Sequence, residues 1–173
     1  MMRDSHWVRS GGGTSLVCAL VLLSLACGEP NSAPGKTSDP KLVECPTAQT
    51  LSATGTITPL VGGTIAVGGS SVVLPVGAVS VPTVITLTVP ASSYVEVELR
   101  ANGLEHLVFA LPLRVTIDYS RCTRTDINQK PLAAWHIDTD TKALLEDMHG
   151  TDDKSARTVT FTTGHFSSYA IAQ

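Results

Sequence analysis

The sequence predicts an all-β fold, an antiparallel β-sandwich of about 8–10 short strands, in one domain over residues 50–173. Several segments of this region alternate apolar and polar residues with period two, as half-buried strands do. Clusters rich in Gly, Pro, Ser and Asp separate the segments and are typical of tight turns. Helical periodicity is weak throughout, so packed antiparallel sheets are favoured over helical or mixed folds.

The first predicted strands lie between residues 62 and 119. GGTIAVGGSSVVLP places two apolar runs around Gly68-Gly69, a dipeptide that readily adopts the positive φ angles of a hairpin turn. VITLTV and YVEVELR follow, and the alternation of each predicts one buried and one solvated face. LPLRVTIDY continues the pattern, with Leu113, Val115 and Ile117 expected inside and Arg114, Thr116 and Asp118 outside.

The remaining predicted strands lie between residues 132 and 172. LAAWHID and KALLEDM flank Thr139-Asp140-Thr141, which predicts a second hairpin, although KALLEDM is ambiguous between a strand and a short helix. RTVTFTT and SSYAIA close the series. Trp135 and Phe161 lie within alternating segments, so we expect them in the core rather than on a sugar-stacking platform.

The N-terminus has the layout of a bacterial secretory signal. Arg3 and Arg9 precede SLVCALVLLSLAC, an apolar run that ends in small residues before Cys27. The run is shorter than the roughly 20 residues that span a bilayer. LSLAC resembles a lipobox, in which a peptidase cleaves before a cysteine that carries lipid. We therefore predict a lipoprotein signal peptide over residues 1–26 and lipidation of Cys27. An ordinary signal peptide and a secreted or periplasmic protein form the alternative.

Residues 27–49 are predicted to be a flexible tether. The segment is rich in Gly, Pro, Ser and Thr and has few large apolar residues to bury. A flexible chain of this length would hold a domain about 25 Å from the membrane. Gly28 follows the cysteine, where retention at the inner membrane of enteric bacteria uses Asp, so an outer-membrane location is favoured. The lipid on Cys27 would make the membrane a partner.

The cysteines predict one disulfide. Cys18 would leave with the signal and Cys27 would carry lipid, so Cys45 and Cys122 would be the only thiols in an oxidising compartment. We expect them to pair. Two free thiols are the alternative, because sequence spacing does not establish the geometry that a disulfide needs.

The charge of the chain argues against a nucleic-acid partner. The formal net charge is −3, and the predicted signal carries two arginines and one aspartate, so its removal makes the protein more acidic by one charge. Nucleic-acid binding needs a basic face that neutralises phosphates.

Four motifs in order resemble those of a known β-sandwich family. They are Gly62-Gly63, Leu74–Ala78, Trp135–Asp138 and His165–Tyr169. Together they are similar to the domain shared by zonula occludens proteins, netrin receptors and ankyrins, which also occurs in bacterial surface proteins. One turn departs from the family pattern, with Pro-Val-Gly-Ala in place of Pro-Pro-Gly-Ala. The resemblance implies a non-catalytic interaction or structural module, whose partner would be an envelope or extracellular protein or a glycan.

The tripeptide His165-Phe166-Ser167 suggests an alternative function. Some eukaryotic relatives of this family, and an unrelated nucleoporin domain, cleave themselves at the same three residues. If the peptide is strained, the Ser167 hydroxyl can attack the Phe166 carbonyl while His165 assists proton transfer. Period-two alternation over residues 166–171 instead predicts an ordinary closing strand. We favour the strand and expect no enzymatic activity, with a single self-cleavage between Phe166 and Ser167 as the alternative.

Neither the acidic residues nor the histidines show metal-binding spacing, so we predict no metal and no cofactor. Acidic residues of the late turns lack the glycine and the bidentate glutamate of an EF-hand loop. They are Asp138, Asp140, Asp152 and Asp153. The histidines form no His-x-x-x-His pattern; those considered as ligands are His106, His136 and His149. Glycines 62–69 do not open a helix, which argues against a phosphate-binding loop.

Overall fold

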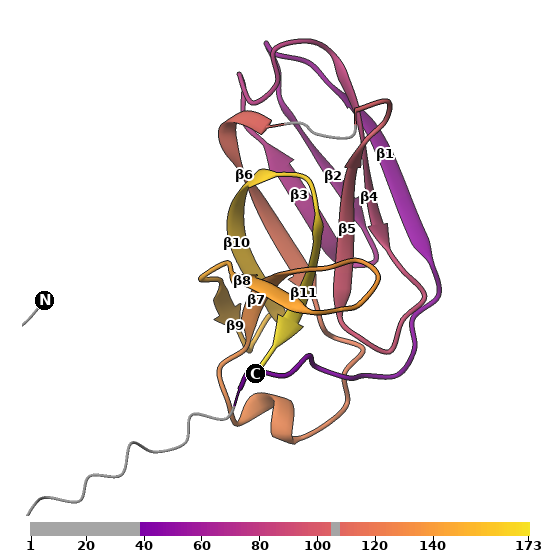
Figure 1. Cartoon of the computed structure of the whole chain (residues 1–173), viewed down its shortest axis with the longest axis vertical. Coiled ribbons are helices and arrows are strands. Elements are labelled where there is room, and N and C mark those ends of the chain that lie inside the picture. The colour runs from indigo at the N-terminus through magenta and orange to yellow at the C-terminus, as the bar shows by residue number, and fades with distance from the viewer. Residues whose placement is uncertain (1–38, 105–107) are drawn as a thin grey trace, which may run out of the picture. The chain divides into compact units, whose positions relative to one another are not determined.

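The computed structural model describes residues 39–104 and 108–173. Within these residues, eleven strands form two antiparallel sheets that pack against each other, which confirms the predicted β-sandwich (Figure 1). The described part contains no helix that is long and apolar enough to cross a membrane. The predicted signal peptide and Cys27, the predicted site of lipidation, lie outside the described residues.

The six-stranded sheet has the order β1-β4-β5-β11-β7-β8, and all neighbouring strands are antiparallel. Its strands are β1 (Leu51–Ile57), β4 (Thr83–Val89), β5 (Glu96–Ala101), β11 (Ser168–Ala172), β7 (Ala133–Ile137) and β8 (Leu144–Asp147). The last strand, β11, is therefore held between β5 and β7 in the middle of the sheet.

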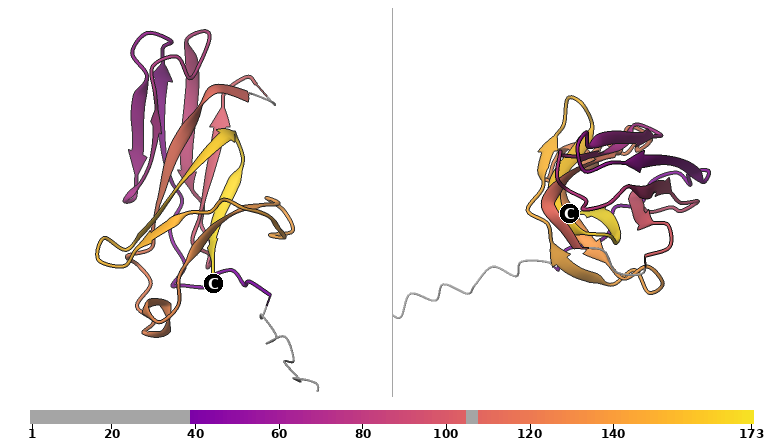
Figure 2. Two further views of the ribbon diagram at one scale, coloured as in Figure 1. Left: turned by 90° about the vertical axis from the view of Figure 1, so that its left-hand side faces the viewer. Right: turned by 90° about the horizontal axis from the view of Figure 1, so that it is seen from above.

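The five-stranded sheet has the order β2-β3-β6-β10-β9, again antiparallel throughout. Its strands are β2 (Gly63–Val67), β3 (Ser70–Leu74), β6 (Val108–Asp118), β10 (Thr158–His165) and β9 (Thr151–Asp153). A single 3₁₀ turn, η1 (Asp126–Asn128), lies between β6 and β7. The chain passes from one sheet to the other several times, as Figure 2 shows.

The alternation of β6 places its side chains as predicted. Leu113, Val115 and Ile117 are buried in the core, whereas Arg114 is exposed and Thr116 and Asp118 are partly exposed. The two sheets contact each other through the Phe161 ring of β10 and the Tyr169 ring of β11, whose centroids are 4.9 Å apart. One cluster of buried residues from both sheets makes up this core.

The two predicted hairpins are present. Gly68 and Gly69 join β2 to β3 with φ angles of 58° and 82°, and an added Cβ on Gly69 would lie 2.7 Å from Asp118. KALLEDM contains the strand β8, which pairs with β7. The turn between them is organised by Asp138, whose Oδ1 accepts hydrogen bonds from the backbone N–H groups of Asp140 and Thr141.

The sandwich begins earlier in the chain than residue 50. Residues 41–45, which we assigned to the tether, form backbone hydrogen bonds with the six-stranded sheet and its connections. The Val43 N–H donates to the Ile171 carbonyl oxygen of β11, and the Cys45 N–H donates to the Ser93 carbonyl oxygen between β4 and β5. The Val43 side chain is buried in the core. Isolated apolar residues within a Pro- and Ser-rich segment give no periodic signal, so their docking depends on the finished sheet. The rest of the predicted tether, up to residue 38, lies outside the described residues.

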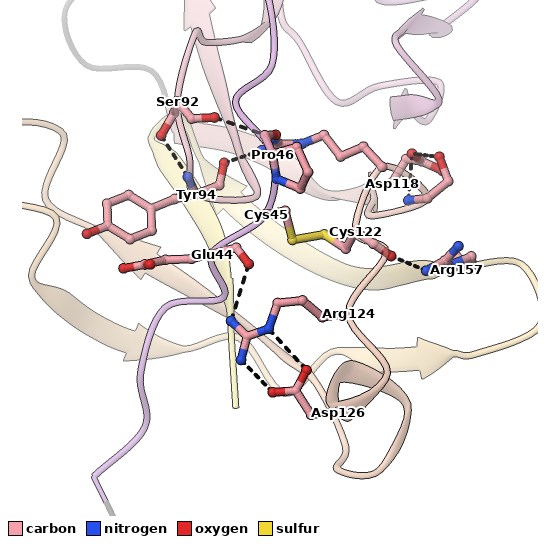
Figure 3. The surroundings of a disulfide bond; sticks show 12 residues. Glu44, Cys45, Pro46, Ser92, Tyr94, Asp118, Cys122, Arg124, Asp126 and Arg157 are labelled. Atoms are coloured by element: carbon pink, nitrogen blue, oxygen red, sulfur yellow. Dashed lines mark hydrogen bonds and ion pairs between the residues drawn. A yellow bond between two sulfur atoms is a disulfide. The ribbon is translucent and has the colours of Figure 1, made fainter.

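A disulfide joins Cys45 to Cys122, which confirms the predicted pairing (Figure 3). The two Cα atoms are 4.9 Å apart, within the range that a disulfide spans. Arg124 supports the same region, because its guanidinium pairs with Asp126 and also donates to the Glu44 carbonyl. The N-terminal segment is therefore fixed to the loop that follows β6.

Trp135 and Glu96 differ from the expectation for their strands. Trp135 was expected in the core together with Phe161; Phe161 is buried there, but Trp135 is only half-buried and lies outside the core. Trp135 pairs with Ala170 on the outer face of the sheet, so its ring points away from the other sheet. Glu96, predicted to be solvated, is 4% exposed on the same outer face.

Glu96 is buried because the β7–β8 hairpin covers it. The turn of this hairpin crosses β11 toward β5 (Figure 1). Lys142 Nζ at the turn lies 2.7 Å from Glu96 Oε2, and Thr139 hydrogen-bonds to the Ser168 hydroxyl. A strand pattern shows which side chains leave the core, but it does not show that a distant hairpin will fold over them.

Candidate functional site

The tripeptide His165-Phe166-Ser167 lies where the chain changes sheets. His165 is the last residue of β10, and β11 begins at Ser168 in the other sheet. The predicted closing strand is therefore wrong for Phe166 and Ser167, which form an irregular connection between two strands. The reason is topological: the two strands belong to different sheets, and the chain must cross from one layer to the other.

The connection is held by contacts on both sides. The Phe166 ring packs edge-on against Phe109, with a centroid distance of 4.5 Å. The Leu99 N–H donates to the Ser167 carbonyl oxygen at 2.9 Å. Phe166 and Ser167 are both partly exposed and line a shallow surface depression beside β5.

The His165 ring faces groups other than the Ser167 hydroxyl. Its Nδ1 lies 3.3 Å from the Tyr169 hydroxyl and 3.5 Å from the Phe166 carbonyl oxygen. Within the described residues, neither Phe166 nor Ser167 has a positive φ, and no hydrogen bond joins His165 to the Ser167 hydroxyl. The arrangement brings an imidazole ring beside the carbonyl that self-cleavage would attack, but it places no base at the Ser167 hydroxyl within the described residues.

Tyr169 anchors the His165 end of β10. Its hydroxyl donates to the His165 carbonyl oxygen at 2.8 Å and lies 2.7 Å from the hydroxyl of buried Thr163. Burial raises the pKa of Tyr169 to about 12, so the hydroxyl keeps its proton at neutral pH.

A second group of residues, which the sequence did not single out, gathers beside this point. His136, Glu146 and His165 each place one potential ligand atom within 4.8 Å of the others. His136 and His165 have ring centroids 5.1 Å apart. Burial and the neighbouring His165 both lower the pKa of His136, which favours its neutral form.

The sequence contains only a partial signal for this cluster. His136 and Glu146 flank the predicted hairpin and are direct partners in its register, so they could have been expected on one face. His165 comes from the other sheet, and no spacing along the chain indicates its approach.

Within the described residues, the other candidate ligands do not gather into a metal-binding cluster. Asp138 organises the β7–β8 turn, and Asp153 accepts hydrogen bonds from Ser155 in another turn. Asp152 accepts a hydrogen bond from the buried Tyr119 hydroxyl at 2.8 Å. The His149 side chain is 89% exposed. His106 lies outside the described residues.

Exposed apolar side chains gather at one end of the sandwich. Leu60 and Val61 in the β1–β2 connection are 86% and 74% exposed, and Val76 after β3 is 57% exposed. The two connections touch, because the Gly77 N–H donates to the Pro59 carbonyl oxygen at 2.8 Å. Figures 1 and 2 show these connections at the end opposite the C-terminus.

Comparison of the sequence with protein-family models and with curated proteins found no match.

Proposed function

We propose that the chain is a non-catalytic lipoprotein of the bacterial envelope whose β-sandwich is an interaction or structural module. The lipid on Cys27 would attach it to a membrane, most consistently the outer membrane, because Gly28 follows the cysteine. The resemblance to the domain of zonula occludens proteins, netrin receptors and ankyrins is part of this proposal.

The observation that carries the proposal is the exposed apolar end of the sandwich. We call Leu60, Val61, Val76 and Leu111 the apolar tip. Leu111 belongs to it because its side chain lies 3.7 Å from a Cβ built on Gly77, the residue after Val76. Exposed apolar side chains that gather on adjoining connections of a folded domain are typical of interaction sites.

The position of the apolar tip fits a tethered module. Residues 41–45 enter the sandwich beside the C-terminal end of β11, at the opposite end from the β1–β2 connection (Figure 1). Loops that project away from the attachment point are the ones that a partner in the envelope or outside the cell can reach.

The anchor is tested by replacing Cys27 with Ser. We expect the wild-type protein in the membrane fraction and C27S in the soluble fraction, because the substituted residue cannot accept the lipid. Mass spectrometry of the wild-type N-terminal peptide should show a diacylated Cys27. A soluble wild-type protein cleaved at another position would contradict the anchor.

The interaction role is tested by photo-crosslinking in living cells. A photoreactive amino acid at Val61 should form an adduct with an envelope component. The matched control is Leu145 of β8, an apolar side chain that is 55% exposed but lies outside the apolar tip. Equal labelling at both positions, or no adduct at any residue of the tip, would overturn the assignment of this surface.

A single self-cleavage between Phe166 and Ser167 is the second candidate. It is favoured by the irregular connection, where His165 Nδ1 lies 3.5 Å from the Phe166 carbonyl oxygen. Attack by the Ser167 hydroxyl on the Phe166 carbonyl carbon would break the peptide bond, which frees the Ser167 amine and forms an ester. Water would then hydrolyse the ester to a carboxyl on Phe166 and the regenerated Ser167 hydroxyl.

Intact mass under denaturing conditions distinguishes the two candidates. Denaturation is needed because β11 pairs with both β5 and β7 and would stay bound after cleavage. A module without cleavage keeps its full mature mass. Loss of the segment SSYAIAQ, abolished by Ser167→Ala, would establish self-cleavage instead.

A further inference from the structure

We propose that His136, Glu146 and His165 form a binding site for one Zn²⁺ ion. One ligand atom from each side chain lies within 4.8 Å of the other two. The proposal does not depend on the lipid anchor or on the apolar tip, since none of these residues belongs to either.

The fold brings the three side chains together from three strands. His136 on β7 pairs directly with Glu146 on β8, so both side chains lie on the same face of the six-stranded sheet. His136 also pairs with Tyr169, whose buried ring packs against Phe161 of the other sheet. This face is therefore the inner one, and there His165 at the end of β10 meets His136.

The site lies at the edge of the sandwich, where an ion can enter. β8 is the last strand of its sheet, and Glu146 is exposed, whereas both histidines are partly buried. A tetrahedral Zn²⁺ with bonds of about 2.0–2.1 Å holds its ligand atoms about 3.4 Å apart. Rotation of the exposed Glu146 side chain, with small movements of the imidazoles, would shorten the present separations of up to 4.8 Å to this value.

The donor set selects the class of metal. Two imidazole nitrogens and one carboxylate oxygen are ligands that Zn²⁺ binds in proteins, with water completing the tetrahedron. Ca²⁺ takes six to eight oxygen ligands, and Mg²⁺ takes an octahedron of oxygen ligands. This cluster offers the oxygens of only one carboxylate. We therefore expect Zn²⁺ to bind and the two alkaline-earth ions not to compete.

Neighbouring residues orient His165 for this role. When Nδ1 of His165 carries the proton, it faces the Tyr169 hydroxyl oxygen at 3.3 Å and leaves the Nε2 lone pair free. Tyr169 is itself fixed by Thr163 and by the His165 carbonyl oxygen. Metal-bound histidines commonly have such a partner on the second ring nitrogen.

An ion at this point would join the two sheets. His136 and Glu146 come from the six-stranded sheet and His165 from the five-stranded sheet, so one ion would link β7 and β8 to β10. Because the site needs both sheets in place, Zn²⁺ should stabilise the folded state over the unfolded state.

The test is calorimetric titration of the full-length protein, purified without a polyhistidine tag and treated with a chelator that is then removed. We expect ZnCl₂ to bind at one ion per chain and to raise the Tm, and an excess of CaCl₂ or MgCl₂ to leave this binding unchanged. Co²⁺ should give the intense visible absorption of a tetrahedral complex.

Variants assign the ligands. His136→Gln and His165→Gln should each weaken Zn²⁺ binding by about 100-fold or more, because each removes one of three protein ligands. Tyr169→Phe should weaken it about tenfold by freeing the His165 ring. His149→Gln is the matched control, since this exposed histidine lies near Asp147 but outside the cluster, and it should bind as the wild type does.

Circular dichroism of each variant without metal establishes that it is folded, and a variant that fails is replaced by Glu146→Gln, which changes an exposed position. The absence of a saturable site on the wild-type protein would overturn the proposal. Binding that survives both His136→Gln and His165→Gln, or that is lost in His149→Gln, would overturn it as well.

Discussion

At the scale of single residues, the ion pair between Glu96 and Lys142 fastens the β7–β8 hairpin to the outer face of the six-stranded sheet. The Glu96 side chain is 3% exposed and the Lys142 side chain 29%. Glu96 Oε1 is also buried and has no hydrogen-bond partner among the described residues, so the ion pair with Lys142 is the direct compensation for this carboxylate. A charge buried in this way is destabilising once its partner is removed.

We predict that Lys142→Met lowers the free energy of unfolding by about 3 kcal/mol, because it leaves the Glu96 carboxylate buried and unpaired. The double variant Glu96→Leu with Lys142→Met should recover most of the loss. Urea denaturation measures both. Arg100→Met, which breaks the ion pair of the exposed Arg100 with Glu98, is the control and should change little. Equal effects of Lys142→Met and Arg100→Met would show that burial of the Glu96–Lys142 pair does not increase its contribution to stability.

A second prediction concerns Tyr119. Burial and the hydrogen bond to Asp152 raise the pKa of Tyr119 above its usual value of 10.0. The unfolded chain loses this proton more easily than the folded one, so the stability that Tyr119 contributes is present below about pH 10 and is lost as the pH rises further. Thermal unfolding between pH 8 and pH 11 should show this decline.

Tyr119→Phe provides the comparison. The variant should be less stable at neutral pH by about 1–2 kcal/mol, since Asp152 loses a hydrogen bond. Its stability should also fall less steeply than that of the wild type at alkaline pH. Parallel pH curves for the two proteins would assign the alkaline decline to other groups.

At the scale of elements, the connections depend on glycines with positive φ. Gly62 ends the β1–β2 connection with φ 67°, and an added Cβ would lie 2.4 Å from the Leu74 carbonyl oxygen. Gly77 after β3 has φ 83°, but among the described residues its added Cβ would meet only the Leu111 side chain, at 3.7 Å. Substitutions at Gly62 and Gly77 therefore allow the cost of backbone strain, present at both, to be distinguished from the cost of a steric clash, present only at Gly62.

We predict that Gly62→Ala destabilises the protein by about 2 kcal/mol or more, because it combines strain with a clash against the backbone. Gly77→Ala should cost about 1 kcal/mol from strain alone. Chemical denaturation of the two variants measures the difference. Equal losses would mean that the β1–β2 connection relaxes freely around the new methyl group.

The elements themselves differ in how well the sequence predicts them. Period-two alternation identifies β4 and β6, and paired glycines identify the β2–β3 hairpin, because these signals are local. The short strand β9 spans only Thr151–Asp153 and has no pattern of its own. It exists because β10 offers it a backbone edge to pair with.

At the scale of the whole molecule, the disulfide joins segments 77 residues apart. Closing a loop of this length is expected to stabilise the fold by about 4 kcal/mol through the entropy of the unfolded chain. Reduction should therefore lower the Tm by several degrees, as calorimetry would record. The variant with both Cys45→Ala and Cys122→Ala should be less stable and should not respond to the reductant. A wild-type Tm that is unchanged on full reduction would contradict this account.

The candidate sites show the limit of prediction from sequence most clearly. His165, Phe166 and Ser167 are recognisable as a motif, but their place between the sheets depends on where β11 docks. His136 and Glu146 are linked by a local hairpin, whereas His165 joins them only after the two sheets have packed.

Apart from β1 and β9, the sequence by itself determined the strands, two hairpin turns, the buried side of β6 and the pair of cysteines available to bond. These follow from local chemistry, because side chains alternate along a strand and turn residues select backbone angles. The tertiary structure decided that β11 lies between β5 and β7, that Glu96 is covered, and that His165 meets His136. These depend on contacts between residues distant in the chain, and no period or spacing encodes which of the many compatible surfaces will pack together.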